Sequence, residues 1–380
     1  MRFGYGFFVL LPVIFLLSGC AGRVPVPHPP PVEALFPVRA ADVDFSDDLD
    51  NDSLNAAIER SLHYYNRIGD HVVYRLAGRL VTRQQMIASL LAFRQIMREE
   101  GVIDDRNKRI SRDFDVYRAT GQDGRGTVLF TGYYVPVMEG SLTRTDKYKY
   151  PLYKPPPDLA DGNNAKDAYY SRKEIDANGV LQGKNLEIAW VADPIELFFL
   201  HIQGSGELKL ENGDILTVSV AGTNGRSYRS VPGYLLEKGI ISARDASNRN
   251  IKRFLKGKNE SDLYEILGFN ERYIFFNFAE KATGSLGEPV TSGRTIATDP
   301  EMFPPGALAF VKLRKPLLDQ EGNPTKQKMS LARFVLNQDK GDAIRGPGRV
   351  DLFCGFGGAA ESMAETLKEK GELYFLVKKQ

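Results

Sequence analysis

The chain has 380 residues, of which 42% are hydrophobic and 26% charged, and its 50 lysine and arginine residues nearly balance 48 aspartate and glutamate residues. These fractions are typical of a folded protein of two or three domains, and they exclude a disordered chain, a collagen, a coiled coil and a multi-span membrane protein. The small net charge gives no reason to expect nucleic acid as a partner, and two cysteines and four histidines offer little material for a disulfide scaffold or a zinc site.

Residues 1–19 are expected to form a lipoprotein signal peptide. Arg2 supplies a positive charge, and the apolar run 7–17 is too short to span a bilayer as a helix. The run ends in Leu17-Ser18-Gly19-Cys20, which resembles a lipobox, and the thiol of Cys20 would accept the lipid. An ordinary signal peptide with an accidental cysteine is the alternative. Ala21, in place of an aspartate, favours the outer membrane as the location, with the protein facing the periplasm.

Residues 20–45 are expected to form the lipidated cysteine and a tether. Six prolines lie between positions 21 and 37, and bulky side chains are few. Such a composition favours an extended polyproline II conformation, which acts as a semi-rigid spacer. A nondescript tail is the alternative, and it would serve the same purpose.

The body of the chain is expected to be mainly β with flanking helices. One helix should begin at Asp52, and a second should begin at Thr82, whose pairing with Gln85 forms a capping box, and end at Gly101. Short apolar runs broken by glycine and proline predict strands, namely 128–130, 189–191, 208–210, 215–220, 308–313, 334–336, 350–353 and 373–377.

The second half is expected to contain further helices. A helical block is predicted between 230 and 268, from apolar residues at three- and four-residue spacing. A last helix is predicted over 359–370, closed by Gly371 and followed by the last strand.

Histidine-based mechanisms find little support in the sequence. His201 is expected on a strand that runs into the turn Gly204-Ser205-Gly206, but only a few residues separate it from Ser205 and no orienting acid is evident. No metalloprotease, Walker or nucleophile-elbow motif with its partners is present. Once these mechanisms are set aside, catalysis by carboxylate side chains is the class that remains.

The richest segment for such chemistry is 336–353. It contains Asp339, Asp342 and Asp351 together with three cations and three glycines. Asp351 lies between Val350 and Leu352 at the start of a predicted strand, and partial desolvation there would raise its pKa, so that it could hold a proton for a leaving oxygen. A polar hairpin whose aspartates merely cap turns is the alternative.

Four further segments carry distinctive patterns. They are FTGYYVP at 130–136, LHIQGSG at 200–206, AGTNGRSY at 221–228, and GRTIATDP at 293–300 followed by PGA at 305–307. Together with 336–353 they resemble, in order, the motifs of the MltA family of membrane-bound lytic murein transglycosylases, which break peptidoglycan. Five ordered motifs are far more specific than any one of them.

The resemblance implies a fold and a catalytic residue. The fold is a double-psi β-barrel catalytic domain with a helical flank, over 46–136 and 276–380, facing an inserted β domain over 137–275 across a substrate groove. The catalytic acid and base is Asp351, and Asp339 and Asp299 are supporting carboxylates. The chain departs from the family pattern at Asp342, which replaces a glycine near Asp339 and leaves the supporting roles open.

The resemblance also implies a reaction. The family cleaves the β-1,4 bond between N-acetylmuramic acid (MurNAc) and N-acetylglucosamine (GlcNAc) without water, forming a 1,6-anhydro sugar, and no metal or cofactor is implied. The expected partners are peptidoglycan glycan strands and, through the lipid, a membrane; protein partners are unknown. The candidate sugar contacts are Tyr133, Tyr134 and Tyr228, each alternatively a core residue, and Thr131, Gln203, Ser205, Asn224 and Arg226.

Two other classes of function stay open. One is a peptidoglycan hydrolase that recruits water through Asp339, Asp342 or Asp299. The other is a glycan-binding lipoprotein without turnover. Cys354 follows Asp351 by three positions, and strand alternation points its thiol to the opposite face, so we interpret it as a packed thiol rather than a nucleophile.

Overall fold

The computed structural model describes residues 33–99, 102–159, 168–242, 246, 248–319, 323–341 and 343–380. The expected signal peptide, Cys20, the first part of the tether and Asp342 lie outside these residues. Within the described part, no helix has both the length and the apolar character needed to cross a membrane.

Six strands close into a barrel. They are β5 (Val128–Val135), β12 (Thr295–Ala297), β13 (Leu308–Leu318), β14 (Pro324–Asp339), β15 (Arg349–Phe356) and β16 (Lys368–Lys378). They follow one another in the order β16-β13-β14-β12-β15-β5, and β5 pairs again with β16, so the ring has no free edge. The pairs β12–β14 and β15–β5 are parallel, and the other pairs are antiparallel.

Helices and two outer strands cover this barrel. The strands β1 (Leu35–Val38) and β4 (Phe114–Ala119) extend the sheet beyond β16. The helices α1 (Asn51–Arg67), α2 (Arg83–Glu99) and α3 (Ile103–Asp113) share one apolar core with the barrel strands. Shorter elements complete the flank, namely η1 (Ala40–Asp42) and the hairpin of β2 (Val73–Leu76) and β3 (Arg79–Thr82).

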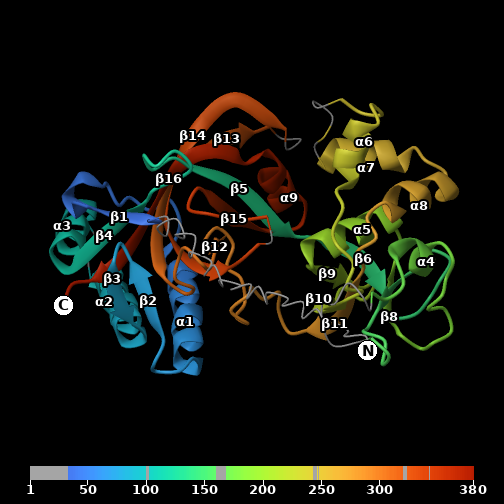
Figure 1. Cartoon of the computed structure of the whole chain (residues 1–380), viewed down its shortest axis with the longest axis horizontal. Coiled ribbons are helices and arrows are strands. Elements are labelled where there is room, and N and C mark those ends of the chain that lie inside the picture. Colours follow the sequence, from blue (N-terminus) through green and yellow to red (C-terminus); the bar gives the residue numbers. More distant parts are fainter. Residues whose placement is uncertain are drawn as a thin grey trace, which may run out of the picture. The chain divides into compact units, whose positions relative to one another are not determined.

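A second sheet is formed by the chain between β5 and β12. Its order is β11 (Ile274–Ala279), β10 (Ile215–Thr223), β9 (Ser205–Lys209), β6 (Val137–Ser141), β8 (Glu187–Val191) and β7 (Tyr150–Tyr153). Figure 1 shows helices α4 to α8 gathered around this sheet. They are α4 (Arg172–Asp176), α5 (Pro194–Gln203), α6 (Val231–Glu237), α7 (Asn248–Lys256) and α8 (Glu260–Gly268). The predicted fold class, a barrel with an inserted β domain and flanking helices, is therefore confirmed.

Local signals explain most of the helix ends. Thr82 and Gln85 form the predicted capping box: the Thr82 hydroxyl accepts from the Gln85 amide at 3.2 Å, and the Gln85 side chain accepts from the Thr82 amide at 2.9 Å. The helix predicted from Asp52 begins one residue earlier, because Asp50 is the residue whose side chain accepts from the Ser53 amide. The helix α3 was not predicted, since its sequence IDDRNKRISRD is almost entirely polar.

Two predicted elements were wrong. His201 lies on the helix α5 rather than on a strand, because Asp193 caps the helix and Pro194 occupies its first turn, while the run 197–200 is apolar on every side. The last helix, α9 (Gly357–Thr366), ends before the predicted residue, and Gly371 lies within β16. A Cβ at Gly371 would lie 2.6 Å from the Lys312 carbonyl oxygen of the neighbouring strand, so glycine serves close strand contact there and not a helix end.

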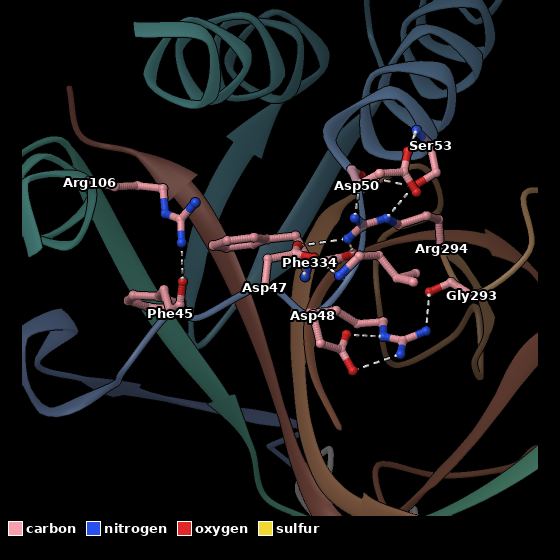
Figure 2. Close-up of polar contacts among 11 residues, drawn as sticks. Phe45, Asp47, Asp48, Asp50, Ser53, Arg106, Gly293, Arg294 and Phe334 are labelled. Carbon is pink, nitrogen blue, oxygen red and sulfur yellow. Dashed lines mark hydrogen bonds and ion pairs between the residues drawn. The ribbon is translucent and has the colours of Figure 1, made fainter. Parts of the chain in front are cut away.

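A buried arginine fastens the N-terminal flank to the barrel. The side chain of Arg294 is 0% exposed, and its guanidinium donates to the Asp47 carboxylate at 2.7 Å, the Phe334 carbonyl at 2.8 Å and the Asp50 carbonyl at 2.7 Å (Figure 2). Its Nε donates to the Ser53 hydroxyl at 3.1 Å. One planar side chain therefore holds the start of α1 against β12 and β14.

Candidate active site

Asp351 and Thr131 face each other on the two parallel strands β15 and β5. Val350 and Leu352 point into the barrel core, so Asp351 between them points out of it. The strand register sets Asp351 opposite Thr131, whose hydroxyl donates to the Asp351 carboxylate at 2.8 Å. The closed barrel thus joins two side chains that are 220 positions apart in the sequence.

The surroundings of Asp351 favour its protonated form. Burial raises its pKa to about 6, the Asp339 carboxylate adds to this effect, and the Thr131 hydroxyl and the Arg349 guanidinium oppose it. Arg349 lies two residues earlier on the same strand face, and its guanidinium lies 3.5 Å from the Thr131 hydroxyl oxygen. A carboxyl group with these neighbours can exchange a proton near neutral pH.

Asp339 is the second carboxylate of this cluster, and it has several donors. One oxygen accepts from the backbone amides of Ser285 and Lys340, each at 2.8 Å. The other accepts from the Tyr133 hydroxyl at 2.9 Å. Burial raises the pKa of Asp339, and these hydrogen bonds oppose the rise. Tyr133 comes from β5, two residues after Thr131, so one strand contacts both carboxylates.

Two buried residues with amide side chains, Asn337 and Gln338, directly precede Asp339 and were not predicted as site residues. Gln338 donates to the Ala57 carbonyl at 2.7 Å and accepts from the Thr295 hydroxyl at 2.8 Å. Asn337 donates to the Pro304 carbonyl at 2.8 Å. Both side chains are buried, and they fix the end of β14 against α1 and the neighbouring loop. Their polar character inside an apolar strand was the signal that sequence reasoning left unused.

Asp299 shapes the loop that leads to Asp351. Its carboxylate accepts from the Gly346 amide at 2.7 Å and from the Glu301 amide at 3.1 Å. Gly346 has a positive φ of 74°, a conformation that glycine adopts without strain. Asp299 therefore contacts the backbone of this loop, and no hydrogen bond among the described residues links it to Asp351.

Tyr134 points away from Tyr133, as neighbouring residues of a strand must. Its ring packs with Ala360 and Ala364 of α9, and its hydroxyl donates to Glu361 at 2.8 Å. Cys354 lies beside this cluster, and burial raises its pKa to about 12. Its thiol is free, and it contacts the Leu352 carbonyl at 3.5 Å. The packed thiol expected from strand alternation agrees with these contacts.

Two of the five candidate residues of the insert bind other protein groups, and the other three lie nearer to solvent. Asn224 is fully buried, and its amide group binds the backbone of Tyr170, Glu271 and Tyr273. Arg226 donates to the Tyr169 carbonyl and to the Glu271 carboxylate. The other three are nearer to solvent: Tyr228 is 48% exposed, Gln203 ends α5, and Ser205 lies 3.4 Å from the Ser219 hydroxyl.

His201 has a structural environment. Its Nδ1 accepts from the Ile274 amide at 3.1 Å, and its ring packs edge-on against Tyr273 and Phe276. Burial keeps its pKa well below the usual value, so the imidazole is neutral. These contacts agree with the prediction that His201 does not act as the base of a Ser-His pair.

Family models match two parts of the chain. A model described as the MltA specific insert domain matches residues 129–277, and a model described as the 3D domain matches residues 294–377. The first match contains the second sheet and its helices, and the second contains most of the barrel, including Asp351.

Curated relatives match across both parts. The membrane-bound lytic murein transglycosylase A of Escherichia coli K12 is 31% identical over 277 residues, which are 72% of each chain. The protein of the same name from Vibrio cholerae is 30% identical over 67% of each chain.

Solved structures share the fold. A crystal structure of E. coli MltA with bound chitohexaose matches with a TM-score of 0.73 and 24% identity, covering 92% of this chain and 96% of that one. The lytic transglycosylase LtgG of Burkholderia pseudomallei matches with a TM-score of 0.58 and 29% identity, covering 91% and 96%. The fold and the site define a barrel enzyme with an inserted β domain. The chain belongs to the MltA family of membrane-bound lytic murein transglycosylases.

Proposed function

We propose that this transglycosylase cleaves the β-1,4 bond between MurNAc and GlcNAc in peptidoglycan with Asp351 as its single catalytic acid and base. The observation that carries the proposal is the setting of Asp351: a buried carboxyl group whose pKa is raised to about 6, held by the Thr131 hydroxyl and close to a second carboxylate.

The protonated Asp351 donates its proton to the glycosidic oxygen, and the bond to C1 of MurNAc breaks through an oxocarbenium-like transition state. The same group, now a carboxylate, takes the proton of the MurNAc C6 hydroxyl, whose oxygen attacks C1 and closes the 1,6-anhydro ring. One carboxyl group suffices because the nucleophile belongs to the substrate, whereas most glycosidases need two.

The other site residues have supporting parts in this proposal. Asp339 keeps a negative charge beside Asp351 and favours its protonated form, and Tyr133 holds Asp339. Asp299 keeps the loop before Asp351 in place. Thr131, Gln203, Ser205 and Tyr228 are candidates for sugar contact, and the backbone contacts of Asn224 and Arg226 fit a role in shaping the insert.

A hydrolase that activates water is the second candidate, and the described contacts favour it less. A general base for water needs a carboxylate oxygen open to that water. Both oxygens of Asp339 already accept hydrogen bonds from protein groups, and so do both oxygens of Asp299, which leaves each carboxylate fewer lone pairs for a water. Asp342, the third carboxylate of this alternative, lies outside the described residues.

Product analysis tests the proposal. Purified sacculi digested with the wild-type protein should yield muropeptides with 1,6-anhydro ends, which are 18 Da lighter than the reducing ends that a hydrolase leaves. Asp351→Asn should lower the rate at least about a hundredfold, in keeping with the loss of general acid catalysis. Reducing-end products, or an Asp351→Asn variant as fast as the wild type, would refute the assignment.

The proposed location of the protein rests on the predicted signal peptide, lipidated cysteine and tether of residues 1–45. The family is membrane-bound by name, and we propose that the lipid on Cys20 supplies the attachment and that the outer membrane is its site. A tether with the extended conformation that its prolines favour would then let the catalytic body reach glycan strands some distance from the lipid surface.

A further inference from the structure

Lys252 on α7 is a buried cation that the proposed mechanism does not use. Its side chain is 11% exposed, and its ammonium donates to Glu196 of α5 at 2.7 Å and to Glu361 of α9 at 2.6 Å. The ammonium also lies 4.9 Å from the centre of the Phe199 ring. Burial lowers the pKa of Lys252, but its hydrogen bonds to the two carboxylates outweigh this effect and raise it. One charged group thus connects two helices of the insert with the helix that joins β15 to β16.

Glu361 extends this connection to the strand of the active site. The oxygen that binds Lys252 also accepts from the Tyr134 hydroxyl at 2.8 Å. Tyr134 follows Tyr133 on β5, and the two side chains leave opposite faces of the strand. Tyr133 contacts Asp339 on one face, and Tyr134 contacts Glu361 on the other. The same strand therefore brings Thr131 to Asp351. Three residues later it is held through Tyr134 by Glu361, the residue that also binds Lys252.

A second contact runs parallel to the first. Arg249, one helical turn before Lys252, donates to the Ser362 hydroxyl of α9 at 3.0 Å and also contacts Asn323 at the start of the long strand β14. Two cations on one face of α7 thus bind neighbouring residues on α9. Such a pair of contacts resists rotation of the insert helices more than one contact would.

We propose that Lys252 is a positioning residue, which holds the insert against β5 and α9 so that sugar units bound by the insert stay in register with Asp351. The inference rests on the proposed function, because register matters only where one glycan strand contacts both the insert and Asp351. A long strand depends on the insert for its alignment, whereas a short one is held by groups near Asp351 alone.

Glu365 makes this connection sensitive to pH. It lines a cavity of about 320 Å³ beside Lys252, and one of its carboxylate oxygens is buried without a hydrogen-bond partner among the described residues. Burial and the neighbouring Glu361 raise its pKa to about 7. The groups that face it from the packed elements are Tyr134 of β5, Glu196 of α5, Arg249, Lys252, Arg253 and Lys256 of α7, and Glu361 of α9.

The sign of the pH effect follows from this raised pKa. Below pH 7 Glu365 is neutral, and Lys252 binds Glu196 and Glu361 without competition. Above pH 7 Glu365, which lies on α9 one turn after Glu361, becomes a third carboxylate. Burial and the charge of Glu361 oppose this ionisation more than Lys252 and Arg249 favour it, so the packed arrangement of α7 on α9 loses stability. The connection between insert and barrel is therefore tightest below pH 7 and weakens as the pH rises through that value.

The test compares long and short substrates with the full-length protein. Lys252→Met should raise KM on long glycan strands about tenfold, with kcat changed less than threefold, and should leave both constants on a tetrasaccharide within twofold. Lys252→Arg should restore most of the affinity, because a guanidinium can reach both carboxylates. Lys238→Met, which removes an exposed lysine at the end of α6, should match the wild type.

The variant Glu365→Gln supplies a second measurement that does not depend on removing the cation. On long strands, the wild type should lose affinity between pH 6 and pH 8, and Glu365→Gln should lose less than half as much. The inference is overturned if Lys252→Met changes long and short substrates equally, or if Glu365→Gln keeps the wild-type pH dependence. Either result would leave the 1,6-anhydro product, and with it the proposed function, intact.

Discussion

At the scale of the residue, Asp351 has surroundings that oppose its charge. A carboxyl group on the surface would be ionised at neutral pH and could not donate a proton. Burial shifts the pKa of Asp351 to about 6, while Thr131 and Arg349 keep it from rising further. At neutral pH the Asp351 carboxyl group can therefore both give and take a proton, which its proposed role as a single acid and base requires.

Burial of Asp351 lowers the free energy of unfolding at neutral pH, where its carboxyl group is ionised. Because the folded-state pKa of Asp351 lies above the value of about 4 for an unfolded chain, its contribution to the free energy of unfolding is fully present below pH 4 and is lost as the pH rises to about 6. The loss is about 3 kcal/mol for the rise in pKa from its ordinary value to about 6. Asp351→Asn has no such titration, so its stability relative to the wild type should improve by about that amount between pH 4 and pH 7.

Urea unfolding at the two pH values measures this difference. The comparison is made within each protein across pH, so any constant effect of the amide group cancels. If the wild type and Asp351→Asn lose or gain stability in parallel between pH 4 and pH 7, the carboxyl group does not have a raised pKa.

At the scale of the element, Arg294 holds the beginning of α1 on the barrel through a fully buried ion pair with Asp47. Removing one partner of such a pair leaves an uncompensated buried charge, so Arg294→Met should cost about 3–5 kcal/mol in the free energy of unfolding. The matched control is Arg333→Met, since its partner Asp48 is 30% exposed and can be solvated by water. We expect that variant to lose about 1–2 kcal/mol in the same urea titration. Equal losses for the two variants would show that burial of the Arg294 pair is not what matters.

Sequence patterns predicted those helices and strands whose capping residues or apolar runs lie close together in the chain. The Thr82 capping box and a run in five of the six barrel strands were predicted because their signals lie within a few residues, whereas the short strand β12 was not predicted. The run at 197–200 was assigned wrongly because it is apolar on every side, so its periodicity cannot separate a buried helix from a strand. The family resemblance supplied Asp351, but two partners of Asp339, Tyr133 and Ser285, come from distant segments, and no local pattern reveals that they meet it.

At the scale of the whole molecule, attachment to a membrane is a proposal, supported by the names of the family relatives and by the predicted lipid. The lipid itself is a prediction from Leu17-Ser18-Gly19-Cys20. We expect the mature protein to begin at Cys20 and to carry a mass excess equal to its acyl chains. Intact-mass measurement of protein extracted from membranes checks this. A mature N-terminus at any other residue, or an unmodified Cys20, would exclude the lipoprotein assignment.

The closure of the barrel also has a consequence for the order of events during synthesis. Thr131 and Asp351 lie 220 positions apart, the whole second sheet forms from the chain between them, and β16 at the end of the chain must pair with β5 before the ring is complete. No nascent fragment that ends before β15 contains Asp351, and none that ends before β16 can close the barrel. We therefore expect the proposed acid to acquire its Thr131 contact within a closed barrel only after the last strand has folded, and contacts between such distant segments form slowly.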